Sequence, residues 1–183
     1  IRPHFLFNSL NAALSLIRAR PQQAEAALES LSDLFRAAMR DPGELVSLAD
    51  EIDLGRQYLE LEKLRLGERL HVDWQLAGVP MDLPIPPLML QPLLENAVYH
   101  GIEPSPEGGS VTVAIQQVGE ELRIVISNPT AGQLPHAAGN QMALANIRER
   151  LALYYDLEAR LETEAGDHRY DVRITLPCKR KTH

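Results

Sequence analysis

The spacing of apolar residues changes near Gly67, and this change constrains the fold more than any other feature of the sequence. Before Gly67, apolar residues recur every three or four positions, as on one face of a helix: Leu6, Leu10, Leu14, Ile17, Leu28, Leu31, Phe35 and Ala38. After it, short segments alternate apolar and polar residues, as strands do, and helical segments separate them. The chain is therefore predicted to be α+β, with a helical N-terminal part and a mixed C-terminal part.

The N-terminal part, residues 1–66, is predicted to form a two-helix hairpin. Pro21 kinks or briefly interrupts the first helical segment, and Asp41-Pro42-Gly43 ends it in a turn. A second helix follows, with Ser47 or Asp50 as its cap. Such a hairpin buries its apolar faces poorly, which favours a four-helix bundle with a second copy of the chain. Packing on the chain's own globular part is the alternative.

The C-terminal part, residues 67–183, is predicted to be an α/β sandwich, a mixed or antiparallel sheet with helices on one face. Helical patterns cover residues 88–100 and 142–155. Alternating patterns predict strands over residues 70–76, 111–117, 122–127, 160–164 and 170–176. Residues 128–140 are predicted to be an irregular connection.

Composition excludes several classes of function. The formal net charge is −7, whereas a general nucleic-acid binder needs concentrated Lys and Arg, so we expect no direct nucleic-acid partner. The single cysteine, Cys178, excludes an internal disulfide. No apolar run approaches the ~18 residues that a transmembrane helix needs. Because the chain begins at Ile1 inside a motif, we expect it to be a fragment of a longer protein.

Two short motifs carry the candidate chemistry. The first, Pro3-His4-Phe5-Leu6-Phe7-Asn8, places a histidine on a helix surface, where an unprotonated imidazole can act as a nucleophile. The second, residues 91–101, places Glu95, Asn96 and His100 on the polar face of an amphipathic helix that ends at a glycine. An Asn amide offers a neutral oxygen to hydrated Mg²⁺. Taken singly, the first motif is better interpreted as a frayed helix terminus, and the second as an exposed polar helix face.

Together, and in this order, the motifs resemble the phosphoacceptor box and the ATP-binding N-box of sensor histidine kinases of the LytS/YehU class. The resemblance covers nearly the whole chain. It implies a dimerisation and histidine-phosphotransfer hairpin at residues 1–66, followed by a GHKL-type (Bergerat) ATP-binding domain at residues 67–183. Such a protein autophosphorylates a histidine from Mg-ATP and passes the phosphoryl group to an aspartate of a response regulator.

The resemblance also implies the setting of this reaction. The expected partners are a second copy of the chain, forming a homodimer, and a response regulator of the LytTR DNA-binding type. The chain is expected to be the cytoplasmic portion of an inner-membrane protein, attached to the membrane only through a part that lies outside this sequence.

Individual roles follow from the same resemblance. His4 is the expected phosphoacceptor, although the position after it lacks the acidic residue of the orthodox box. Asn8, one helical turn further on, is expected to orient the imidazole or a water molecule. Asn96 is the expected ligand of the Mg²⁺ of ATP, and Glu95 and His100 are expected to act on its waters or on the phosphates.

Two glycine-rich boxes depart from the pattern of the class. In the adenine box, Asp-x-Gly-x-Gly, an asparagine takes the Asp position. In the second box, residues 139–144, Gln141 and Ala143 replace two of three glycines, which normally let backbone N–H groups approach phosphates. The residues of these boxes expected to contact the nucleotide are Asn128, Gly132, Gly139 and Leu144.

Alternatives to a competent kinase stay open at this point. The altered second box favours a degenerate dimer that acts as a scaffold or phosphatase for the regulator. A gyrase- or chaperone-like ATPase is disfavoured by the N-terminal histidine hairpin. Downstream, Arg148 or Arg150 either contacts phosphate or forms ion pairs with Glu149 or Glu158 on the helix surface.

Overall fold

A mixed sheet organises the C-terminal part of the chain. The computed structural model describes residues 2–130 and 138–178, and in them the strands follow the order β2-β4-β5-β7-β6. The strands are β2 Leu70–Gln75, β4 Gly109–Val118, β5 Glu121–Pro129, β6 Arg160–Ala165 and β7 Arg169–Pro177. β2 runs parallel to β4, and the other neighbours are antiparallel. The predicted strands and the α+β class are confirmed.

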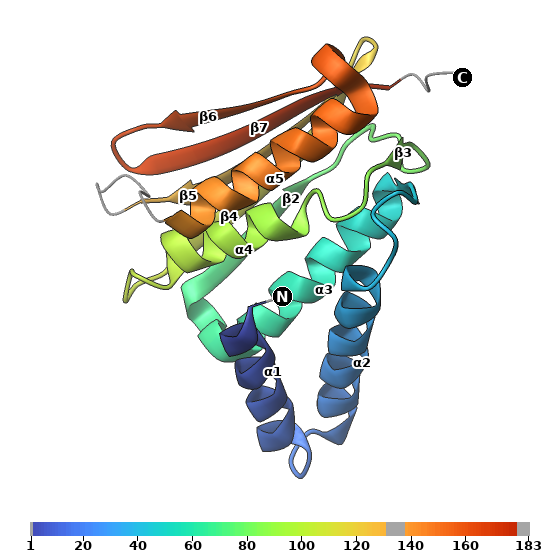
Figure 1. Ribbon diagram of the computed structural model, residues 1–183. Helices are drawn as coiled ribbons and strands as arrows, with labels where there is room; N and C mark the ends of the chain where they lie inside the picture. The colour runs from blue at the N-terminus through green and yellow to red at the C-terminus, as the bar shows by residue number, and fades with distance from the viewer. Residues whose placement is uncertain (1, 131–137, 179–183) are drawn as a thin grey trace.

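Helices cover one face of this sheet. α4 (Gln91–Ala97) continues into the π-helical η2 (Val98–Ile102), and α5 (Ala138–Tyr155) packs beside it across the strands (Figure 1). The alternation along β4 and β5 places one apolar set under these helices. The residues of that set are at most 1% exposed: Val111, Val113, Ile115, Leu122, Ile124 and Ile126.

The N-terminal helices differ from the predicted hairpin. α1 (Pro3–Leu16) and α2 (Pro21–Ala38) pack on one another and extend away from the sheet, with their connecting turn at the far end (Figure 1). Pro21 begins a new helix, because a proline suits the first turn and disfavours helical geometry in the residue before it. With α3, the described residues 2–66 contain three helices, so the two-helix hairpin is corrected.

α3 (Leu48–Leu66) connects these helices to the sheet. Ser47 caps it, accepting the Asp50 backbone N–H at 3.1 Å, which decides between the two predicted caps. Ser47 also belongs to β1 (Val46–Ser47), which pairs with β3 (Pro84–Ile85). A Cβ on Gly55 would lie 2.9 Å from the Leu94 side chain and 3.2 Å from that of Trp74, so any larger residue would require the ends of these side chains to shift. None of the described helices combines the length and apolar character needed to cross a bilayer.

Glu51 of α3 fixes the start of α4. It is 2% exposed, and its carboxylate accepts the backbone N–H groups of Leu88, Met89 and Leu90 at 2.7, 3.0 and 3.2 Å. Burial raises the pKa of Glu51, although these three N–H donors lower it. The donors are the N-cap residue of α4, Leu90, and the two residues before it, so these bonds fix the loop that enters α4. Leu88 has a φ of 57°, a conformation unusual for leucine, which these bonds stabilise.

Replacing Glu51 by alanine is expected to destabilise the chain by about 3 kcal/mol or more, because buried N–H groups lose their acceptor. Urea unfolding measures the change. Glu60→Ala is the matched control, since Glu60 is exposed on the same helix and its loss should cost less than about 0.5 kcal/mol. Equal stability of the two variants would show that Glu51 does not stabilise the loop before α4.

Candidate nucleotide site

Asn96 lies at the centre of a series of polar contacts between distant parts of the chain. It is 7% exposed. Arg2, the N-cap of α1, donates from Nη2 to Asn96 Oδ1 at 2.9 Å. Asn96 Nδ2 donates to Asn140 Oδ1 of α5 at 3.1 Å, and Asn140 Nδ2 lies 3.5 Å from the Tyr170 hydroxyl of β7. The predicted metal ligand is therefore buried with its amide oxygen bonded to a cation.

A small cavity adjoins Asn96 between α4, α5 and the sheet. Its volume is about 10 Å³, room for about one water molecule. Three of the predicted site residues, Asn96, His100 and Asn128, line it together. The complete lining is Leu93, Asn96, Ala97, His100, Ile126, Asn128, Asn140, Tyr170 and Val172. Binding an adenine nucleotide here requires the surrounding side chains to move apart.

His100 contributes a polar atom that lacks a partner. Its Nε2 is buried and has no hydrogen-bond partner among the described residues. Tyr99 packs edge-on against the imidazole, with ring centroids 4.9 Å apart. Burial lowers the pKa of His100, the charge of Arg2 lowers it further, and Glu103 opposes both. A neutral imidazole with an unpaired nitrogen at a cavity is a group that a polar ligand can satisfy.

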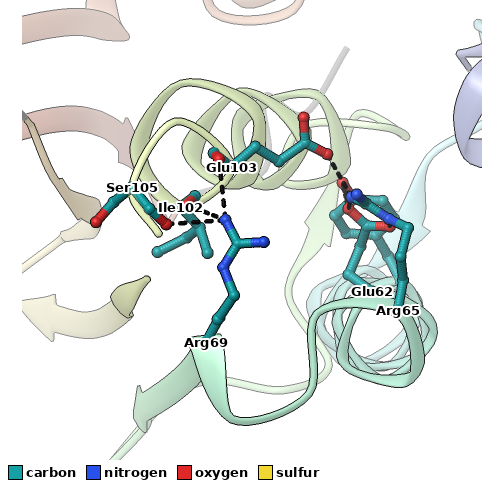
Figure 2. Close-up of polar contacts among 7 residues, drawn as sticks. Glu62, Arg65, Arg69, Ile102, Glu103 and Ser105 are labelled. Carbon is teal, nitrogen blue, oxygen red and sulfur yellow. Dashed lines mark hydrogen bonds and ion pairs between the residues drawn. The ribbon is translucent and has the colours of Figure 1, made fainter. Parts of the chain in front are cut away.

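Two arginines position the end of the helix that carries His100. Figure 2 shows Arg69 Nη2 donating to three backbone carbonyls, those of Ile102, Glu103 and Ser105, at 3.3, 2.9 and 2.8 Å. In the same view Arg65 bridges the carboxylates of Glu62, at 2.8 Å, and Glu103. The bonds from Arg69 satisfy carbonyls at the end of η2, whose wide π-helical turn follows Ala97.

Gly101 allows the helix end to approach strand β5. A Cβ at this position would lie 2.6 Å from Nδ2 and 2.7 Å from Cβ of Asn128. Asn128 is 5% exposed, and its Nδ2 donates to the Pro129 carbonyl at 2.9 Å. The glycine that ends the second motif therefore has a packing role, because any larger residue displaces the asparagine in the predicted adenine position.

The second glycine box lies inside a helix. α5 begins at Ala138, four residues before the predicted start at Met142, so residues 139–144 are helical and do not form a loop. Within it, Leu144 is buried in the core and is not among the cavity's lining residues. Gly139 belongs to the first turn of α5, and Gly132 lies outside the described residues. Of the predicted irregular segment 128–140, residues 128–129 belong to β5 and residues 138–140 to α5, and residues 131–137 lie outside the described residues.

The other predicted residues lie outside the cavity. His4 and Asn8 are exposed on α1. Glu95 is half-buried on α4 and accepts a hydrogen bond from Gln91 Nε2 at 3.3 Å. Arg150 donates to the Leu88 carbonyl at 3.2 Å and to the Pro87 carbonyl, a backbone role that neither predicted alternative included.

Sequence reasoning missed three residues of the polar series around Asn96. Arg2 could have been suspected from the sequence, because it directly precedes the histidine motif. Asn140 offered a weaker indication, because it is a polar residue inside the altered glycine box. Nothing in the sequence indicated Tyr170, because a tyrosine on an alternating strand is usually part of the packing.

Gly101→Ala is expected to cost about 1–3 kcal/mol of stability, because the new methyl group collides with the Asn128 side chain. Gly166→Ala is the control, since its Cβ would meet its nearest neighbour at an ordinary 3.6 Å. Urea denaturation of both variants measures the difference. A Gly101→Ala variant as stable as the Gly166→Ala variant would mean that Asn128 moves without cost.

Stability is expected to fall on acidification through the contribution of His100. A lowered pKa means that the unfolded chain binds the proton more readily, so this contribution is present above pH 6.5 and is lost as pH falls through the folded value. The slope of unfolding free energy against pH between 6.5 and 5 should therefore decrease in His100→Gln. His71→Gln, which alters an exposed histidine, should keep the slope of the unaltered chain. A steeper slope in His100→Gln would mean that His100 stabilises the fold on acidification, opposite to the expectation.

Comparison with known sequences agrees with the motif resemblance. Residues 1–70 match the sequence model of the Histidine kinase family. The sensor histidine kinase BtsS of Escherichia coli (strain K12) is 34% identical over 96% of this chain, and the sensor protein LytS of Oceanobacillus iheyensis is 31% identical over 98%. The sensor histidine kinase/phosphatase LytS of Staphylococcus aureus is 27% identical over 99%. The chain spans only 31%, 34% and 33% of the length of these relatives.

Solved structures agree in fold. The catalytic domain of the histidine kinase ThkA has a TM-score of 0.57 at 12% identity, covering 75% of this chain and 98% of that one. The kinase domain of a blue-light activated histidine kinase from Erythrobacter litoralis has a TM-score of 0.54 at 18% identity, covering 90% of this chain and 85% of that one. The chain is therefore a homologue of LytS-type sensor histidine kinases, with the fold of a histidine kinase catalytic domain.

Proposed function

We propose that this chain is the kinase part of a sensor histidine kinase of a two-component system. In this proposal His4 receives the γ-phosphoryl group of Mg-ATP and passes it to an aspartate of a response regulator. The observation that carries the proposal is the convergence on one cavity of Asn96, His100 and Asn128. The names of the relatives support it, since each is a sensor histidine kinase or a sensor protein.

The residues around the cavity fit a magnesium nucleotide. Asn96 Oδ1 is a neutral oxygen of the kind that hydrated Mg²⁺ accepts as a ligand. His100 Nε2 is a buried nitrogen that lacks a partner among the described residues. Asn128 offers an amide in the position where the class recognises adenine. Glu95, which precedes Asn96 on α4, is proposed to act on the waters of the metal. When bound, Mg-ATP supplies the phosphoryl group and a metal charge that neutralises the phosphates.

His4 has the exposure that a phosphoacceptor needs. The lone pair of its Nε2 forms the new N–P bond as the P–O bond to the departing ADP breaks, while Nδ1 keeps its proton. Asn8 lies one turn further along the same helix and is proposed to orient the imidazole. The chain contributes chiefly by positioning these groups, as in other phosphoryl transfers.

The outer surfaces of α1 and α2 support a homodimer. Large apolar side chains on these helices and their ends are 37–82% exposed, which is unusual for a surface that faces only water. These residues are Phe7, Leu14, Ile17, Leu28, Phe35 and Met39. We propose that a second copy covers them in a helical bundle, with residues 1–66 as the dimerisation and phosphotransfer part and residues 67–183 as the ATP-binding part.

Finer assignments rest on the similarity of the motifs. Within the LytS class, we propose that the histidine motif and the Asn96 motif of this chain most resemble those of AlgZ, the alginate and twitching-motility sensor. A regulator with a LytTR-type DNA-binding domain is the proposed partner, and a cytoplasmic position in an inner-membrane protein is the proposed setting. The coarser parts of this proposal are supported by the LytS relatives.

Autophosphorylation with labelled ATP tests the proposed reaction. The unaltered chain should acquire an acid-labile label, because a phosphoramidate bond hydrolyses in acid. His4→Gln should lose the label completely, and Asn96→Ala should reduce it at least about tenfold through weaker metal binding. His71→Gln, which changes an exposed histidine on β2, should keep it. Label retained in His4→Gln would end the assignment of that residue.

A specific observation favours a second candidate, a non-catalytic scaffold or phosphatase for the regulator. The cavity has a volume of only about 10 Å³, and the second glycine box is helical. A thermal-unfolding experiment separates the candidates, because nucleotide at 100 times its Kd adds about 2.7 kcal/mol of stability. No shift with millimolar Mg-ATP would support the scaffold, whereas a shift would support the kinase.

A further inference from the structure

Arg2 occupies the position that the proposed function assigns to a metal ion. Its Nη2 lies 2.9 Å from Asn96 Oδ1, the oxygen proposed to bind Mg²⁺. A guanidinium, like the metal, is a cation that takes the lone pairs of an oxygen. None of the ion pairs among the described residues includes Arg2, and its side chain hydrogen-bonds this amide instead.

Contacts on both sides keep the guanidinium in this position. Its central carbon lies 4.3 Å from the centroid of the Tyr99 ring, a cation–π geometry. Three residues along the chain, Phe5 is 7% exposed and packs against Tyr58 of α3, with ring centroids 5.0 Å apart. The start of α1 is therefore anchored on α3 while Arg2 reaches α4. This arrangement is more specific than that of a surface arginine, which is usually free to rotate.

Arg2 and Mg²⁺ are expected to exclude one another at Asn96. A metal ligand bond is about 2.1 Å long, so a metal ion on Oδ1 would lie within about 5 Å of the guanidinium nitrogen. Two cations at that separation in a partly buried site repel one another strongly. Arg2 and the metal cannot be separated by turning the amide, because Asn96 Nδ2 already donates to Asn140 and holds its orientation.

We propose that Arg2 competes with the metal of Mg-ATP for Asn96, so that nucleotide binding requires Arg2 to leave this oxygen. The inference rests on the proposed function, because it names a competitor within the same site. Only Pro3 separates Arg2 from His4. Release of Arg2 therefore removes one of the contacts that hold the start of the helix that carries the phosphoacceptor, another being Phe5 against Tyr58. Nucleotide occupancy becomes coupled in this way to the position of His4.

Nucleotide binding to the 183-residue chain tests the competition. Isothermal titration with Mg-AMPPNP, a non-hydrolysable ATP analogue, would compare the unaltered chain with Arg2→Gln. Removing the competitor raises the fraction of binding-competent molecules, so Kd should fall on the order of tenfold. The Mg²⁺ concentration for half-saturation at fixed AMPPNP should fall in parallel. Arg18→Gln, which changes an exposed arginine just after α1, should leave both values unchanged.

A second variant separates charge from the shape of the side chain. Arg2→Lys keeps the cation but loses the planar fork, so its Kd should lie between those of the unaltered chain and Arg2→Gln. Circular dichroism establishes that each variant is folded.

Weaker binding by Arg2→Gln would overturn the proposal and would instead make Arg2 a phosphate ligand. Equal Kd values would also overturn it, while leaving the nucleotide site intact. Absence of binding in both the unaltered chain and Arg2→Gln would remove the competition and the nucleotide site together.

Discussion

The candidate site depends on one short helix, α4, whose two ends are bonded to other parts of the chain. At its start, Glu51 accepts three backbone N–H groups, and at the end of η2, Arg69 donates to three carbonyls. Helix ends leave such groups without partners, and burying them unsatisfied is costly. Because Glu51 belongs to α3 and Arg69 to the short η1 (Gly67–Arg69) that follows it, α3 and η1 together determine where Asn96 lies.

The same helix connects the proposed nucleotide site with the start of the helix that carries the proposed phosphoacceptor, His4. Asn96 faces the cavity on one side and the start of α1 on the other, so any group that binds its oxygen also affects the helix of His4. A phosphotransfer protein must bring a phosphoacceptor close to a nucleotide and then move it away toward another protein. The contact between Arg2 and Asn96 shows one closed arrangement of these parts, in which the cavity has room for about one water molecule.

Much of the sheet could be predicted from the sequence, because alternation of apolar residues states directly which face is buried. The convergence of Asn96, His100 and Asn128 could be predicted only through the family resemblance. The chain reversal before Pro21 could not be predicted, since a proline can kink a helix, interrupt it or begin a new one. The early start of α5 has a physical reason, because replacing glycine by Gln141 and Ala143 raises helix propensity. The contact of Arg2 with a residue 94 positions away has no local signature.

The π-helical turn after Ala97 has a consequence for evolution of the motif. Such a turn accommodates one more residue than an α-turn, and each residue of an α-helix rotates the chain by about 100°. Deleting Val98 or Tyr99 would therefore swing the imidazole of His100 around the helix axis while leaving the imidazole itself unchanged. The length of this short stretch therefore determines which side chain reaches the cavity, and a chain without the extra residue should place a different side chain there.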